Sequence, residues 1–160
     1  GGSYESLRGM TSQLPVMIDT VVVATDGSES VTRAVTVALD LARRFDAEVH
    51  ALYVVDTGEI ESSPESLRDE LRDALHEQGN EALESVHDHA DREVVTAVRE
   101  GDPAATISEY AREEDADVVA TGTRGRHGEN RFLIGSVAER VVRICPTPVL
   151  TVRQLEEETA

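Results

Sequence analysis

The chain has 160 residues, of which 39% are hydrophobic, and this length suits one domain with a single core rather than two. It carries 32 acidic residues against 15 basic ones, and every basic one is arginine because the sequence contains no lysine. The formal net charge of −17 disfavours nucleic acid and anionic membrane surfaces as partners. It also predicts a cytoplasmic protein of a halophilic organism, because molar salt screens the repulsion within so acidic a surface.

The chain is expected to consist of one folded domain with a short segment at each end. Residues 1–15 are rich in glycine and serine and lack periodicity, so we expect a tag or a disordered leader there. The domain itself is predicted at residues 16–153, and residues 154–160 form an acidic tail.

A continuous β-branched run at residues 20–25 begins the predicted domain. Such a run is typical of a strand buried on both faces of a parallel sheet. The turn residues Asp26-Gly27-Ser28 end it, and apolar side chains then recur at helical spacing from Val31 to Phe45. Ser28 is the expected helix cap, since its hydroxyl suits the free amides of a first turn.

The same alternation of strand and helix repeats along the rest of the chain. Further apolar runs predict strands at residues 49–55, 94–98, 118–121 and 148–152. Between them, Ser63-Pro64 and Asp102-Pro103 are predicted helix starts, because proline suits the first helical position. Strands separated by helices favour an α/β domain with a parallel sheet and helices on both faces.

The last helix is predicted at residues 136–145, with three apolar side chains on one face: Val137, Val141 and Ile144. Pro146 ends it. Cys145, at the end of that face, is expected to be an inert packing residue.

Ligands of parallel sheets bind beyond the carboxyl ends of the strands, where the strand order reverses. Three loops with suitable chemistry leave strand ends: Asp26-Gly27-Ser28, Asp56-Thr57-Gly58 and residues 122–136. The third contains three arginines and one glutamate, a local charge of +3 − 1 = +2 in an acidic chain. Its glycines allow the backbone to present bare amides, and the helix that follows adds the positive end of a dipole. This loop therefore predicts an anion site, with a phosphate group as its natural occupant.

The spacing Gly122-x2-Gly125-x9-Gly135-Ser136 identifies the kind of phosphate loop. It is not a Walker A motif, which needs a lysine. With Asp26 after the first strand, it resembles the universal stress protein family, whose ATP-binding members carry G-x2-G-x9-G-[S/T] between the fourth strand and the last helix. The resemblance covers residues 19–153. It implies an adenine nucleotide alpha hydrolase-like, Rossmann-like fold, a five-stranded parallel sheet with strand order 3-2-1-4-5.

The resemblance also implies the ligand and the residues that hold it. The ligand is ATP, accompanied by Mg²⁺. Asp26 and Val54 match the positions that hold the adenosine part. The positions that contact ribose and phosphates, or lie beside them, are Gly122, Thr123, Arg124, Gly125, Gly135, Ser136 and Val137. Family members commonly form homodimers through the last strand, which here begins at Pro148 and ends at Val152.

Each of these residues also has a purely structural interpretation. The glycines of residues 122–136 could form an ordinary flexible connection. Asp26 could be a capping carboxylate in an Asx-type turn. Arg124 and Arg126, which make the loop more basic than the motif requires, could pair with surface carboxylates. Thr121 stands where the family often has a bulkier apolar residue, so packing against the base would be looser.

The sequence shows no catalytic constellation near the phosphate loop. His87 and His89 lie two apart on a predicted helix, a spacing that does not suit a pair of metal ligands. The leading hypothesis is therefore an ATP-binding regulatory or stress-response module without dedicated catalysis. The alternatives are a dimeric interaction or scaffold protein with a vestigial nucleotide groove, and a slow ATPase.

Overall fold

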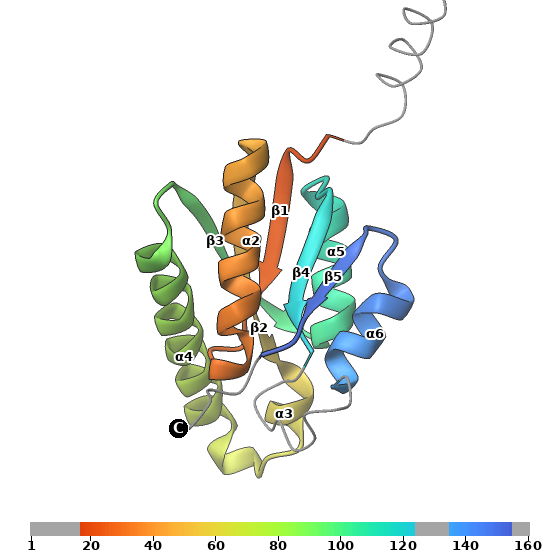
Figure 1. Cartoon of the computed structure of the whole chain (residues 1–160). Coiled ribbons are helices and arrows are strands. Elements are labelled where there is room, and N and C mark those ends of the chain that lie inside the picture. Colours follow the sequence, from red (N-terminus) through yellow and green to blue (C-terminus); the bar gives the residue numbers. More distant parts are fainter. Residues whose placement is uncertain (1–16, 124–134, 155–160) are drawn as a thin grey trace, which may run out of the picture.

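The computed structural model describes residues 17–123 and 135–154, in which five parallel strands form one sheet (Figure 1). The strands are β1 (Thr20–Ala24), β2 (Glu48–Asp56), β3 (Val94–Gly101), β4 (Val118–Gly122) and β5 (Val149–Val152). Their order is β3-β2-β1-β4-β5, and every neighbouring pair is parallel. The predicted strand order is confirmed.

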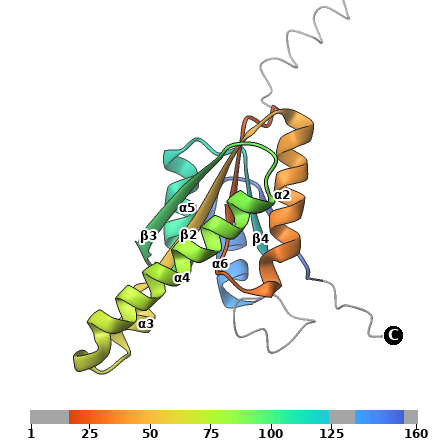
Figure 2. The ribbon, with the colours of Figure 1, turned by 90° about the vertical axis from the view of Figure 1, so that its left-hand side faces the viewer.

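Helices cover both faces of the sheet, and α2 and α5 lie on opposite sides of it in Figure 2. The helices are α2 (Thr32–Phe45), α3 (Thr57–Glu61), α4 (Arg68–His89), α5 (Pro103–Glu113) and α6 (Ser136–Ile144), with the 3-10 turns η1 (Glu29–Val31) and η2 (Glu65–Leu67). One core lies between the sheet and α2 and α4, and a second lies between the sheet and α5 and α6. The predicted α/β architecture is confirmed.

The central strand β1 contributes to both cores. Val21 and Val23 pack on the side of α2 and α4, whereas Val22 packs on the side of α5 and α6. All three side chains are fully buried. Because successive residues of a strand point to opposite faces, an unbroken apolar run is what a strand needs when both faces are covered.

The long helix α4 approaches β2 closely at Gly79. A Cβ atom at this position would lie 2.5 Å from Cδ1 of the buried Tyr53 ring. Glycine weakens a helix interior by about 1 kcal/mol relative to alanine. Its presence in the middle of α4 is explained by the space that the tyrosine ring takes.

Two predicted helix starts are wrong in detail. Ser28 does not cap a helix, because its hydroxyl donates to Asp26 Oδ1 at 2.6 Å. Its carbonyl oxygen accepts from the Val31 amide, and the same i→i+3 pattern joins Pro64 to Leu67. A 3-10 turn therefore precedes the α-helix at both places, so α2 and α4 begin later than predicted.

The apolar repeats of two helices end on exposed residues. Phe45 is 49% exposed and Ile144 is 44% exposed. Each is the last residue of its helix, at the point where the chain turns toward the next strand. The helical period continues to these residues, but the buried face does not.

Candidate functional site

The middle of the sheet contains a reversal of strand order. β1 and β4 pair in the centre, and the chain leaves β1 toward β2 but leaves β4 toward β5 (Figure 1). Connections that diverge in this way leave a crevice beyond the carboxyl ends of the two strands. The two segments that flank this crevice are the turn after β1 and the crossing from β4 to α6.

The turn after β1 is closed by its own side chains. Asp26 Oδ1 accepts from the Ser28 amide at 2.9 Å and from the Ser28 hydroxyl at 2.6 Å. Thr25 Oγ1 accepts from the Gly27 amide at 3.1 Å, and Gly27 has a φ of 80°, in the left-handed region. Asp26 is thus the centre of an Asx turn. Both of its bonds use Oδ1, so Oδ2 takes no part in the turn.

The two ends of the crossing after β4 are held by backbone atoms instead. The Thr123 amide donates to Val152 O at 3.1 Å, and the Gly135 amide donates to Thr123 O. The residues on either side of the crossing are therefore joined directly. Arg124 and Gly125 were predicted to bind the ligand, but they fall in residues 124–134, outside the described residues.

The first turn of α6 offers backbone amide donors to this site. Gly135 is the N-cap residue of α6, and no side chain caps the helix. The first amides of a helix have no acceptor within it, so Ser136 and Val137 present donors at the positive end of the helix dipole. Both residues are exposed, as an anion site requires.

Val54 is placed on β2 beside the turn after β1. Ala24, the last residue of β1, pairs with Leu52, so Val54 lies two residues beyond the end of β1. Its side chain is partly buried against the core of α5 and α6. The structure thus places Asp26, Val54, Gly122, Thr123, Gly135, Ser136 and Val137 along the same carboxyl edge of the sheet.

An ion pair that the sequence did not predict connects α6 to α5. Arg140 Nη1 donates to Asp102 Oδ1 at 2.8 Å, while Asp102 Oδ2 accepts from the Ala105 amide at 3.1 Å. These two bonds, the arginine first, hold the pKa of Asp102 below its usual range. The predicted role of Asp102 at the start of α5 is confirmed, since it is the N-cap residue. Its second partner lies 38 residues away, too far for local patterning to reveal.

The loop predicted at Asp56-Thr57-Gly58 is the start of the short helix α3. Asp56 Oδ1 accepts from the Gly58 amide at 2.9 Å and from the Glu59 amide at 3.4 Å. Asp56 therefore caps a helix.

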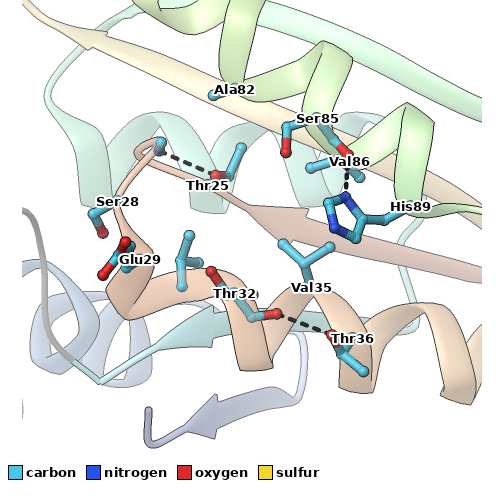
Figure 3. Close-up of a pocket in the computed structure, with 12 residues that line it drawn as sticks. Thr25, Ser28, Glu29, Thr32, Val35, Thr36, Ala82, Ser85, Val86 and His89 are labelled. Carbon is cyan, nitrogen blue, oxygen red and sulfur yellow. Dashed lines mark hydrogen bonds between the residues drawn. The ribbon is translucent and has the colours of Figure 1, made fainter. Parts of the chain in front are cut away.

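A groove of about 240 Å³ lies between α2 and α4 and reaches the turn after β1 (Figure 3). Its floor is apolar, with Val35 and Val86 pointing into it, and Ser85 and His89 lie along the α4 rim. Gly27 and Ser28 reach its end, but Asp26 does not line it. This groove was not predicted from the sequence, because its two walls come from helices that are far apart in the chain.

The two histidines near the end of α4 have separate partners. His89 Nδ1 donates to Ser85 O at 2.7 Å, and His87 Nδ1 lies 3.8 Å from Asp88 Oδ1. Within residues 17–123 and 135–154, no group of three or more histidine, cysteine, aspartate or glutamate side chains is arranged to hold a metal ion. In the same residues, no helix is both long and apolar enough to cross a bilayer.

Comparison with known proteins gives a consistent result. Residues 17–153 match the universal stress protein family. The chain is 39% identical over 142 residues to a universal stress protein of Methanocaldococcus jannaschii, an alignment that covers 86% of this chain and 84% of that protein.

Solved structures agree with the fold. The universal stress protein UspA from Lactobacillus plantarum superimposes with a TM-score of 0.72 at 26% identity, covering 86% of this chain and 99% of that one. A universal stress protein in complex with cAMP superimposes with a TM-score of 0.63 at 27% identity, covering 86% of this chain and 98% of that one.

Proposed function

Because the chain belongs to the universal stress protein family, we propose that it binds ATP beyond the carboxyl ends of β1 and β4 and acts as a nucleotide-dependent regulatory module. The observation that carries this proposal is the meeting of two complementary segments at the strand-order reversal. One is the Asp26 turn, and the other is the uncapped start of α6. The complex of a related protein with cAMP supports an adenine nucleotide as the ligand class.

The two segments would divide the ligand between them. The amides of Ser136 and Val137, at the positive end of α6, suit the phosphates, whereas the Gly135 amide donates to Thr123 O. Asp26 Oδ2 and the Val54 backbone suit the adenosine part, since both lie beside the end of β1. Gly122, Thr123, Arg124 and Gly125 would complete the phosphate contacts.

Mg²⁺ would bind together with the triphosphate, and protein side chains alone would not form its site. Mg²⁺ keeps several of its waters and takes substrate phosphate oxygens as ligands. This fits a described site whose phosphate end consists of amide donors. We propose binding without dedicated turnover, because Asp26 is the only carboxylate among the proposed ligand contacts and its Oδ1 is engaged by Ser28.

The edge strand β5 favours a second, compatible role in self-association. Among the described residues β5 pairs only with β4, and it carries no charged residue in a chain of net charge −17. Leu150 on this strand is 36% exposed. We propose a homodimer formed through this strand, from Pro148 to Val152. If the nucleotide site is vestigial, dimer formation would be the function that remains.

The composition also supports a proposal about the cellular location of the protein. The excess of acidic residues and the absence of lysine fit a cytoplasmic protein of a halophilic organism. Binding is therefore best measured at high salt.

Isothermal titration of the protein with ATP and MgCl₂ in 2 M KCl tests the proposal. We expect saturable binding of one nucleotide per chain, with a matched titration of inorganic triphosphate showing how much of the affinity comes from adenosine. The absence of saturable binding by ATP at millimolar concentration would reject nucleotide binding and leave only the self-association role.

A further inference from the structure

The groove between α2 and α4 has an apolar floor and a polar rim. The rim carries hydroxyl groups together with the side chains of Glu29 and His89. Val35 and Val86, from opposite walls, point into the groove (Figure 3). Sites for small organic molecules share this pattern of an apolar lining with a few polar groups. Four floor side chains are each at most 8% exposed: Val31, Val35, Ala82 and Val86.

The groove runs from the turn after β1 to the end of α4. Its α4 wall is one face of the helix, formed by residues at helical spacing: Ala82, Ser85, Val86 and His89. A Cβ atom at Gly27 would lie 3.3 Å from the Ala82 Cβ, so the Ala82 end is the one beside the turn. His89 lies seven positions further along α4, which is about 10 Å at the helical rise of ~1.5 Å per residue. A bound molecule must match this length.

The end of the groove beside the turn is negatively charged. Glu29 lies two residues after Gly27, in the first turn of η1, and its side chain is exposed. Within the described part of the chain, no arginine lines the groove and none pairs with Glu29. A surface with a large excess of negative charge also attracts cations from solution. A positively charged group can therefore contact Glu29 without displacing a cation of the protein itself.

The other end of the groove offers a hydrogen-bond acceptor. His89 Nδ1 donates to Ser85 O at 2.7 Å. Because a carbonyl oxygen can only accept, Nδ1 carries the hydrogen of the neutral ring and Nε2 has a lone pair. His89 and Val35 line the groove from its two helices (Figure 3). An N–H donor at this end of a bound molecule would therefore find an acceptor.

The volume of the groove gives a second measure of the size of its ligand. A water molecule occupies about 30 Å³ in the liquid, so a groove of about 240 Å³ corresponds to about eight groups of that size. An extended chain of eight atoms is about 9 Å long, in agreement with the length along α4. The apolar floor suits the methylene groups of such a chain.

We propose that the groove binds a linear aliphatic diamine of about eight non-hydrogen atoms. One ammonium group contacts Glu29, the methylene chain lies on the valine floor, and the second amino group donates to His89 Nε2. The groove is separate from the proposed nucleotide site, because Asp26 does not line it. The inference therefore goes beyond the proposed function and does not depend on it.

Titration with 1,6-diaminohexane at pH 8, where an unperturbed imidazole is neutral, tests the charged end of the site. The methyl NMR signals of Val35 and Val86 should shift saturably. Glu29→Gln should weaken binding about 5-fold, the upper range for a surface ion pair. Glu109→Gln is the matched control, because Glu109 is an exposed glutamate of α5, on the opposite side of the sheet from α2 (Figure 2). This control should bind as the wild type does.

Two further ligands and two variants test the other end and the floor. n-Hexylamine lacks the second amino group and 1,6-hexanediol lacks the charge, so each should bind about 5-fold more weakly than the diamine. His89→Phe keeps an aromatic ring without the acceptor, so it should bind the diamine and n-hexylamine equally. Ser85→Phe should prevent binding of the diamine, because the added ring covers the groove.

Three results would overturn the inference. If Glu29→Gln and Glu109→Gln bind the diamine alike, only the net charge of the chain attracts it. Equal affinity of the wild type for the diamine and n-hexylamine would show that His89 does not read the second amino group. Binding without shifts at Val35 and Val86 would place the diamine outside the groove. Titration with ATP is a separate measurement, and its failure would reject the proposed function while leaving this site intact.

Discussion

The turn after β1 and the crossing after β4 flank the same crevice but are built in opposite ways. The turn is closed by short side chains that bond to neighbours two residues away, as Asp26 does with Ser28. At the two ends of the crossing, Thr123 bonds to the neighbouring strand β5 and Gly135 bonds to Thr123 through backbone atoms, and no side chain caps α6. Both segments are attached to a neighbouring strand, because the Thr25 amide donates to Leu52 O of β2 as the Thr123 amide donates to Val152 O of β5. They differ in that the turn also has side-chain bonds of its own, whereas the start of α6 has none. This difference supports our proposal that the Asp26 turn contacts adenosine and the open start of α6 contacts the phosphates.

The largest effect is expected from a negative charge at the start of α6. Ser136→Glu places a carboxylate where the phosphates are proposed to bind, and like charges in contact cost several kcal/mol. ATP affinity should fall by about 100-fold in isothermal titration. Thermal stability should be kept or slightly raised, because acidic residues suit helix N-termini. Unchanged affinity would show that the phosphates lie elsewhere.

Two substitutions of Asp26 separate its structural role from its proposed contact with the ligand. Asp26→Asn keeps an acceptor for the turn, whereas Asp26→Ala removes it and should cost about 1 kcal/mol in the free energy of unfolding. Both should weaken ATP binding about 10-fold if Oδ2 receives a hydrogen bond from the ligand. Chemical denaturation and titration of the two variants measure these effects. If Asp26→Asn binds ATP with wild-type affinity, the role of Asp26 is limited to stabilising the turn.

The ion pair between Asp102 and Arg140 is expected to have a smaller, pH-dependent effect. Arg140 lowers the pKa of Asp102 in the folded chain. The charged Asp102 therefore stabilises the fold above its unfolded pKa, and this contribution is lost as the pH falls through the folded pKa. Asp102→Asn keeps the cap of α5 but loses this charge. Its melting temperature should be slightly lower than that of the wild type at pH 7, and the difference should vanish in acid. A difference that persists unchanged in acid would contradict the charge effect.

The smallest effect is expected from filling the groove between α2 and α4. Ser85 is an exposed residue on its rim, so Ser85→Phe adds a ring over the groove without replacing a core side chain. ATP affinity should stay within about 2-fold of the wild type, a limit set by the context dependence of such effects. A large loss of ATP affinity would indicate that the nucleotide binds in the groove rather than in the crevice.

The sequence was sufficient to predict the sheet because its signals are local. Unbroken apolar runs indicated the strands, and the Asp102-Pro103 start of α5 was read correctly from two neighbouring residues. The order of the strands came from the resemblance to a family. The same signals failed at Ser28, whose hydroxyl donates to Asp26 two residues earlier instead of capping a helix.

The parts of the site that could not be predicted involve residues distant in the chain. Nothing near Arg140 in the sequence indicates Asp102, and nothing near Arg33 indicates the carbonyl of Arg153. The glycine at position 79 is explained only once Tyr53 is seen beside it. Periodicity also cannot show where the buried face of a helix ends, so it did not predict the exposure of Phe45.

A crystal structure of the chain grown with ATP and MgCl₂ tests the central claim most directly. The account predicts the triphosphate within hydrogen-bonding distance of the Ser136 and Val137 amides, with the adenosine beside Asp26 and Val54. Nucleotide density in the groove between α2 and α4, with none at the start of α6, would contradict it.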